Sequence, residues 1–201
     1  MHETRLVAFT RGHRMKCLLR RMLDPDEFLS DYGIRSVSKY HRDHPYRLTV
    51  RDEEKIVNYE PAESQTGIFG GNSNWRGPVW FPINYLLIES LQQFHHYYGD
   101  DFKVECPTRS GRYLTLKGVA NELSNRLIKL WLRNENGERP FLRASPGAFN
   151  SATDSQFYWF HEYFNDDNGG DLGASHQTGW TALVAKLIQQ QGDFGTISQL
   201  R

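Results

Sequence analysis

The sequence has no excess of charge of either sign and no long hydrophobic run. Its 201 residues carry 24 Lys and Arg against 24 Asp and Glu, so the formal net charge is zero. This balance argues against a nucleic-acid binder, which needs basic groups to neutralise phosphates. No apolar stretch approaches the roughly 20 residues that span a bilayer, so we also expect no integral membrane protein.

Cysteine is scarce as well. Cys17 and Cys106 lie far apart and lack the CxxC spacing of a zinc or redox site, so we expect neither a metal site nor a disulfide framework. A reducing, cytoplasmic location is the expectation that follows. The first residues, MHETRLVAF, lack the basic and apolar regions of a secretory signal, which indicates no export.

Aromatic residues, by contrast, are plentiful. The chain has 5 Trp, 10 Tyr and 12 Phe, although its mean hydropathy is −0.66. This content excludes a disordered chain of low hydrophobicity and high net charge. The length is enough for one domain with a sizeable core, or for two smaller ones.

Apolar residues recur at helical spacing in several segments. Residues 84–98 follow Pro82, precede Gly99 and place Leu87 and Leu91 on one face, which predicts a helix. The same pattern predicts helices over residues 15–23, 178–190 and, with Thr115 as the capping residue, 115–130.

Other segments are less regular. Residues 155–163 are dense in aromatic side chains and fit a helix or a strand; the neighbouring helices favour a helix. Residues 46–51 and 55–59 predict a small β-hairpin joined by a turn at residues 52–54. Long connections rich in polar and aromatic residues separate the helices, which indicates a scaffold that displays a site at its loop ends.

The first candidate site lies in the Gly- and Pro-rich segment 70–82, which contains Trp75, Arg76 and Trp80. Flat indole faces suit the C–H faces of sugar rings, and Arg supplies donors to hydroxyl groups, so the segment fits a small-ligand pocket. An equally good interpretation is that both Trp side chains cap the core and that Arg76 pairs with a structural carboxylate.

A second candidate is Glu162, which stands inside the aromatic run 157–164. A carboxylate in such surroundings is rarely buried unless it is paired or functional. The functional interpretation is a general base or acid in a desolvated site. The alternative is a salt-bridged residue at the edge of the core.

A third candidate is segment 173–181, where small residues permit a close backbone approach before His176, Gln177 and Trp180. The nearby Asp166, Asp167 and Asp171 lack the ligand spacing and the closing Glu of an EF-hand loop. We therefore expect no metal site.

Three segments together resemble glycoside hydrolase family 63, in the C-terminal part of its catalytic domain. They read GGNSNWRGPVWFPINYLLIESL, HEYFNDDNGG and GASHQTGWTALVAKLI, and residues 22–36 resemble the same family. The likeness runs from about residue 2 to residue 190. The family includes processing α-glucosidase I and bacterial relatives that act on α-glucosides or mannosylglycerate-type compounds.

The resemblance implies an all-α fold, the C-terminal portion of an (α/α)6 barrel with long loops and one small β-hairpin. It also implies inverting hydrolysis of α-linked gluco-oligosaccharides or related glycosides, with no cofactor. Inverting enzymes use a general acid and a general base whose carboxyl groups lie about 6.5 to 9.5 Å apart. The family's general base falls on Glu162. The implied substrate contacts are Trp75, Arg76, Trp80, Tyr163, His176, Gln177 and Trp180.

Two departures from the family matter. Its general acid is an Asp in the first half of the barrel, which nothing here matches, and Asp166 stands where a small residue, usually Gly, is expected. We therefore expect residues 1–201 to form a single partial domain without the acid, inactive alone, with a flexible tail over 191–201. Its expected partners are an oligosaccharide or small glycoside and the missing half of the barrel. The alternative function is a non-catalytic carbohydrate-binding or interaction domain.

Overall fold

The computed structural model describes residues 8, 10–63, 75–143 and 157–193. Its α-helices in that part of the chain are α1 (Gly12–Met22), α2 (Phe81–Tyr98), α3 (Leu116–Ile128), α4 (Thr178–Thr181) and α5 (Val184–Asp193), with the 3-10 helices η1 (Lys39–Arg42) and η2 (Pro140–Leu142). None of the helices in these segments is long and apolar enough to cross a membrane.

Short strands connect these helices. They are β1 (Leu29–Ser30), β2 (Gly33–Ile34), β3 (Tyr46–Val50), β4 (Glu53–Val57), β5 (Val79–Trp80), β6 (Lys103–Glu105), β7 (Tyr113–Thr115), β8 (Tyr163–Phe164) and β9 (Asp171–Leu172). The pairs β1–β2, β3–β4 and β6–β7 are antiparallel, and β8 pairs antiparallel with both β5 and β9.

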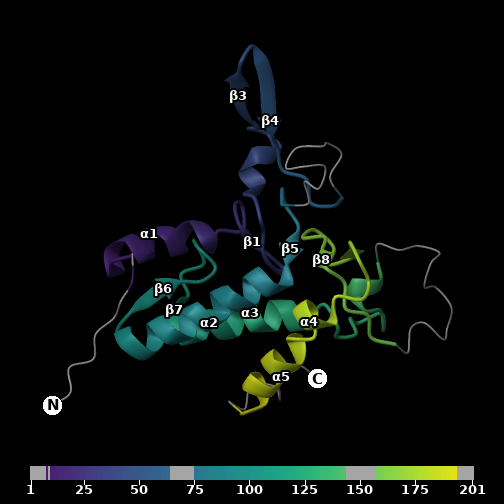
Figure 1. Cartoon of the computed structure of the whole chain (residues 1–201). Helices are drawn as coiled ribbons and strands as arrows, with labels where there is room; N and C mark the ends of the chain where they lie inside the picture. Colours follow the sequence, from purple (N-terminus) through teal and green to yellow (C-terminus); the bar gives the residue numbers. More distant parts are fainter. Residues whose placement is uncertain (1–7, 9, 64–74, 144–156, 194–201) are drawn as a thin grey trace.

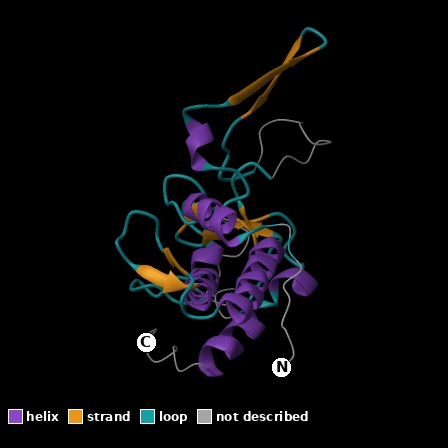
Figure 2. Ribbon diagram, turned by 90° about the vertical axis from the view of Figure 1, so that its left-hand side faces the viewer, coloured by secondary structure: helices purple, strands orange, loops and turns teal. Residues whose placement is uncertain are grey.

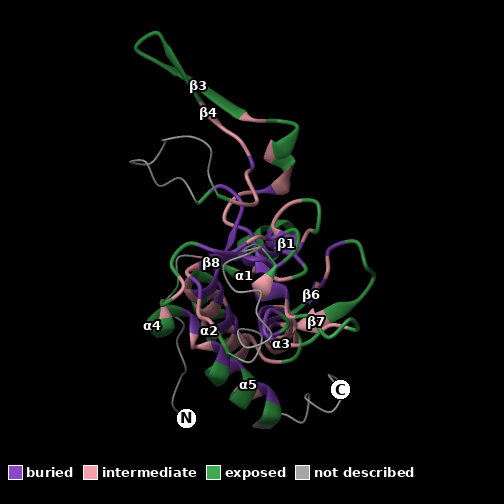
Figure 3. Ribbon diagram, turned by 90° about the vertical axis from the view of Figure 1, so that its right-hand side faces the viewer, coloured by how far each residue is buried: buried purple, intermediate pink, exposed green. Residues whose placement is uncertain are grey.

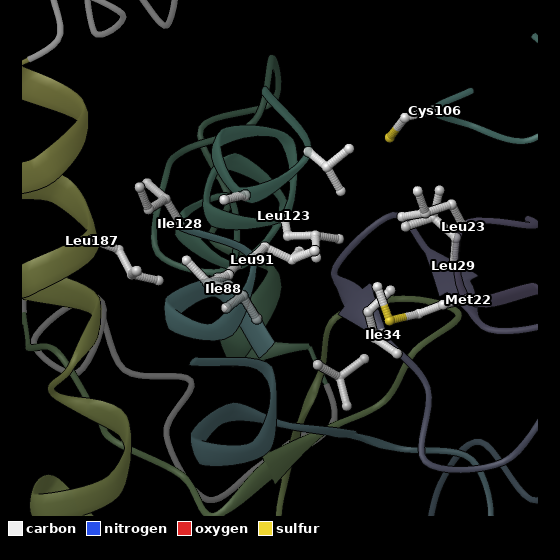
Figure 4. Close-up of a cluster of buried hydrophobic side chains, with 14 of the residues drawn as sticks. Met22, Leu23, Leu29, Ile34, Ile88, Leu91, Cys106, Leu123, Ile128 and Leu187 are labelled. Atoms are coloured by element: carbon white, nitrogen blue, oxygen red, sulfur yellow. The ribbon is translucent and has the colours of Figure 1, made fainter. Parts of the chain in front are cut away.

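The core is built around α2 and α3, which lie side by side (Figures 1 and 2). Ile88 and Leu91 of α2 meet Leu123 of α3 in the interior, and Leu187 of α5 packs on the far side near Ile128 (Figure 4). Side chains from α1, β1 and β2 complete the cluster (Figure 4). Burial of this apolar surface is the main stabilising contribution to the fold.

The helices predicted over residues 84–98 and 115–130 are confirmed as α2 and α3, and the one over 15–23 as α1. The Thr115 side chain caps α3 by accepting a hydrogen bond from the Gly118 amide at 3.1 Å. Gly99 ends α2 with a φ of +68°, a conformation that favours glycine.

The helix predicted over 178–190 is split into α4 and α5. Tertiary bonds set the position of α4: the Gln177 amide donates to the Phe160 carbonyl, and the Thr181 hydroxyl donates to the His161 carbonyl at 2.6 Å. As a result, Trp180 of α4 is 42% exposed.

The prediction of a helix over residues 155–163 is wrong for its described part, residues 157–163, which is extended and ends in β8. The reason is tertiary. Tyr163 pairs with Trp80 on one side and with Leu172 on the other, so its backbone bonds go to neighbouring strands and not to a helix. Residues 155 and 156 lie outside the described residues.

The expected all-α fold is also wrong, because antiparallel strands occur throughout the described segments. Five of these strands, β1, β2, β5, β8 and β9, are two residues long. A strand of two residues cannot show the alternation of apolar and polar side chains by which strands are recognised. The long connections therefore read as loops in the sequence.

The predicted β-hairpin is present as β3 and β4, and it projects away from the helices (Figures 1 and 3). Its turn consists of Arg51 and Asp52, with φ values of +51° and +66°, one residue earlier than predicted. Both residues thus adopt the left-handed conformation of a tight two-residue hairpin turn. The strands expose most of their side chains (Figure 3).

Asn84 on α2 links the helical core to the short strands. It is 1% exposed, its Oδ1 accepts from the Ile34 amide at 2.7 Å, and its Nδ2 donates to the carbonyls of Ile34 and Trp80 at 3.0 and 2.9 Å. One side chain thus satisfies backbone groups of β2 and β5 that no water reaches.

We predict that Asn84→Ala lowers the free energy of unfolding by about 3 kcal/mol, since it leaves buried backbone groups unpaired. The matched control is Gln93→Ala, which removes an exposed amide from the same helix and should change stability by less than about 0.5 kcal/mol. Urea unfolding of both variants checks this, and equal losses would contradict it.

Candidate functional site

The sheet formed by β5, β8 and β9 brings together the three segments that the sequence singled out (Figure 1). Trp80 lies opposite Tyr163, and Tyr163 lies opposite Leu172. These three side chains form a buried cluster of their own. Residues far apart in the chain therefore share one small surface.

An aromatic wall, which we define as Trp75, Trp80, Tyr163 and Trp180, stands on this sheet. Trp80 stacks on Trp75 with ring centroids 4.0 Å apart and on Tyr163 at 4.6 Å, and Trp180 lies 6.1 Å from Trp80. Trp80 and Tyr163 are buried, whereas Trp75 and Trp180 are each 42% exposed. Of these four, Trp75 and Trp180 are the rings that a ligand can reach.

Glu162 directly precedes Tyr163 and is half-buried beside the wall. Its Oε2 accepts a hydrogen bond from the Ala174 amide at 3.4 Å. Gly173, with φ of +69°, lets the turn after β9 approach this close: a Cβ there would lie within 3 Å of the Tyr163 ring and of the Glu162 carboxylate. Small residues in segment 173–181 were expected to permit a close backbone approach. The backbone at Gly173 makes this approach, and it packs against Glu162 and Tyr163.

Arg76 points into the interior instead of toward the wall's exposed face. It is fully buried, forms an ion pair with Glu60 at 2.6 Å, and donates to the Asn58 side chain at 3.2 Å. This pairing agrees with the second interpretation of the sequence, in which Arg76 pairs with a structural carboxylate. A direct contact between Arg76 and substrate stays a prediction.

His176 and Gln177 directly precede the first residue of α4. The His176 ring is exposed and packs at 5.7 Å from the Trp159 ring. Gln177 is half-buried, and its backbone carbonyl accepts from the amides of Trp180 and Thr181. Through their backbone contacts with Phe160, both residues hold the start of α4, which carries Trp180, against the extended segment that leads to Glu162.

A buried ion pair anchors the loop that follows β8. The Arg35 Nε donates to the Asp166 Oδ2 at 2.5 Å, and these side chains are 5% and 0% exposed. Tyr59 also donates to this oxygen, and Arg35 further donates to the Leu29 carbonyl at 2.6 Å. Burial raises the pKa of Asp166, while the Tyr59 hydroxyl and the Arg35 guanidinium oppose that rise.

The other two carboxylates of this region have separate partners. Asp167 pairs with Arg42 at 3.1 Å on the surface, and Asp171 lies 3.4 Å from the His161 Nε2 in the interior. Burial lowers the pKa of His161, although the Asp171 carboxylate counteracts this. The described segments hold no group of three or more His, Cys, Asp or Glu placed for a metal ion.

A pocket of about 300 Å³ is lined in part by the stacked Trp75 and Trp80 rings. Its other lining residues are Phe28, Ile34, Arg35, Ser36, Ile83, Asn84 and Leu87. Most of these are apolar, and the side chains of Arg35 and Asn84 already bond within the protein. The cavity thus offers few groups for sugar hydroxyls, and Glu162 does not line it.

Sequence reasoning missed the residues that support the site. Arg35 lies within a stretch that resembles the family, yet nothing in the sequence marks it as the partner of Asp166, which stood out only as one of three nearby Asp residues and as a departure from the family. Tyr59 and Glu60 could have been found only from their position after the hairpin. Glu63, whose carboxylate bonds to Tyr163 at 2.8 Å, carries no motif at all.

We predict that Arg35→Met costs about 3 to 5 kcal/mol of unfolding free energy at pH 8, since it leaves a buried carboxylate without its cation. Without the guanidinium, burial raises the pKa of Asp166 further. At pH 5 the folded state can then protonate this carboxyl, so the loss of unfolding free energy should be smaller than at pH 8. Arg47→Met, which breaks an exposed pair with Glu54, should cost about 0 to 1 kcal/mol at either pH.

Urea unfolding of both variants at the two pH values measures these losses. Similar losses for Arg35→Met and Arg47→Met, or a loss for Arg35→Met that grows as the pH falls, would contradict the role given to this buried pair.

Comparison with known proteins gives the site a context. The chain is 52% identical over 192 residues to the uncharacterized protein YMR196W of Saccharomyces cerevisiae, covering 94% of this chain and 18% of that protein. It is 27% identical over 176 residues to the mannosyl-oligosaccharide glucosidase of the same yeast, covering 87% of this chain and 15% of the enzyme. It is 23% identical over 178 residues to a probable mannosyl-oligosaccharide glucosidase of Schizosaccharomyces pombe, covering 88% and 15%.

The chain thus spans less than a fifth of the length of these relatives. The matches confirm the resemblance to glycoside hydrolase family 63. Residues 7–181, which include the aromatic wall and Glu162, match the family described as the mannosylglycerate hydrolase MGH1-like glycoside hydrolase domain. The chain therefore belongs to the MGH1-like glycoside hydrolase family and is related to the mannosyl-oligosaccharide glucosidases.

Proposed function

We propose that the chain is part of an enzyme that hydrolyses an α-glycosidic bond, in α-linked gluco-oligosaccharides or related glycosides, with inversion. In this reaction Glu162 is the general base that removes a proton from water as the water attacks the anomeric carbon. Membership of a glycoside hydrolase family supports the reaction class. The substrate class rests on the names of two of the relatives.

The observation that carries the proposal is the position of Glu162 beside the aromatic wall. Its carboxylate is half-buried, and the Ala174 amide holds one oxygen at 3.4 Å, so it has a defined orientation. A carboxylate that is fixed and partly shielded from water is suited to general base catalysis. The exposed rings of Trp75 and Trp180 belong to the same aromatic wall as Tyr163, the chain neighbour of Glu162, and can stack on a sugar.

The remaining candidate residues fit supporting roles in this proposal. Trp80 and Tyr163 are buried and hold the exposed rings in place. His176, whose backbone pairs with Phe160 in the chain that enters β8, and Gln177 at the start of α4 are proposed substrate contacts. Arg76, which follows Trp75 and pairs with Glu60, is a proposed substrate contact as well.

We place the general acid outside these residues, in the rest of the catalytic domain, which is then the partner of this single partial domain. The small share of the relatives' length that the chain spans supports this placement. The cytoplasmic location likewise stays a prediction, supported by Cys17 and Cys106, which are both free thiols.

The test is Glu162→Gln in the product of the complete open reading frame. We expect hydrolysis of α-linked gluco-oligosaccharides to fall by about 10² to 10⁴, the usual contribution of a general base. Glu135→Gln, which alters an exposed Glu in a turn, should leave activity unchanged. NMR of the first sugar released should show the β-anomer, as inversion requires.

A second measurement distinguishes the catalytic proposal from a non-catalytic carbohydrate-binding domain, which the two exposed Trp rings would also fit. Titration with the same oligosaccharides should change Trp fluorescence equally in wild type and in Glu162→Gln. Binding without hydrolysis by the wild type would favour the binding domain. Activity of Glu162→Gln close to that of the wild type would exclude Glu162 as the base.

A further inference from the structure

A short segment that follows the β3–β4 hairpin runs along the edge of the candidate site. We call residues 58–63 the strap. Its side chains reach all three segments that the sequence singled out, through the contacts Tyr59 to Asp166, Glu60 to Arg76, and Glu63 to both Tyr163 and Gly173. The strap therefore contacts the loop that precedes β5, strand β8 with the loop after it, and the turn after β9.

Glu63, at the end of the strap, uses both oxygens of its carboxylate. The Oε2 accepts from the Tyr163 hydroxyl at 2.8 Å, and the Oε1 accepts from the Gly173 amide at 3.2 Å. Burial and, next, this hydrogen bond raise the pKa of Tyr163, so its hydroxyl remains protonated and continues to donate. One side chain thus ties β8 to the turn after β9.

Both contacts lie next to Glu162. Tyr163 is its neighbour in the chain, and the Ala174 amide, which follows Gly173, donates to the Glu162 Oε2 at 3.4 Å. Two consecutive amides of one turn therefore bind two different carboxylates. Because Gly173 touches Glu162 without space for a Cβ, a shift of this turn must also move the Glu162 carboxylate.

We propose that Glu63 is a positioning residue that sets the orientation of Glu162 through the Tyr163 hydroxyl and the turn at Gly173. The proposal rests on the function proposed above. Glu63 does not itself act as the general acid, because both of its oxygens accept hydrogen bonds and neither is arranged to give up a proton. Glu63 is exposed, so its substitution should change the free energy of unfolding only a little.

The experiment compares Glu63→Ala with Glu135→Ala, an exposed Glu away from the site, in the product of the complete open reading frame. We expect Glu63→Ala to lower kcat by about 10- to 100-fold, since a displacement of roughly 1 Å at a catalytic group has that effect. KM should stay within about threefold, because the aromatic wall is intact. Glu135→Ala should match the wild type in both constants.

Two further readouts separate positioning from other roles. Tyr163→Phe removes only the hydroxyl that Glu63 binds, so the double variant should lose little more activity than either single variant. In Glu63→Gln the pH–rate profile should keep its alkaline limb, because the general acid is unaltered. An unchanged kcat in Glu63→Ala, additive losses, or a lost alkaline limb would each overturn the proposal.

Failure of the proposed function can be told apart from failure of this inference. If the wild type hydrolyses no α-glycoside, hydrogen exchange over residues 171–176 still decides the structural link. Faster exchange there in Glu63→Ala than in Glu135→Ala supports the tie between Glu63 and the turn at Gly173. Equal exchange in the two variants overturns it.

Discussion

The antiparallel pairing of β8 with both β5 and β9 is the constraint on which the candidate site depends. Its register sets Trp80 opposite Tyr163 and Tyr163 opposite Leu172. Three segments that are distant in the sequence thus meet at strands of only two residues each. A slip of one residue would set Glu162, in place of Tyr163, opposite Trp80. The position of the candidate base is therefore a consequence of strand register.

Strands of two residues cannot hold such a register by their own hydrogen bonds, so the rest of the fold has to supply the stability. Asn84 ties β5 and β2 to the helical core, and the Arg35–Asp166 pair fixes the loop after β8. These links are buried, polar and fully enclosed, so they specify one arrangement where apolar packing alone would tolerate several. The helices bury most of the apolar surface, and the polar links determine where the site residues lie.

The sequence predicts the parts of the structure whose signals are local. The apolar spacing of α2 and α3 and the hairpin β3–β4 were predicted with nearly correct bounds, because these elements are formed by neighbouring residues. The path of residues 157–163 was not, because its hydrogen bonds go to distant strands. The motifs identified the candidate residues of the wall and Glu162. Glu63 and Tyr59, however, became apparent only when the fold brought them to the site.

The central claim is that the aromatic wall and Glu162 form one sugar site. The most direct measurement is a crystal structure of the complete protein with an iminosugar that mimics the oxocarbenium-like transition state. Our account predicts that the ring stacks on Trp75 or Trp180, with one water between its anomeric position and the Glu162 carboxylate. An inhibitor bound away from this wall, or a Glu162 carboxylate that faces away from it, would contradict the account.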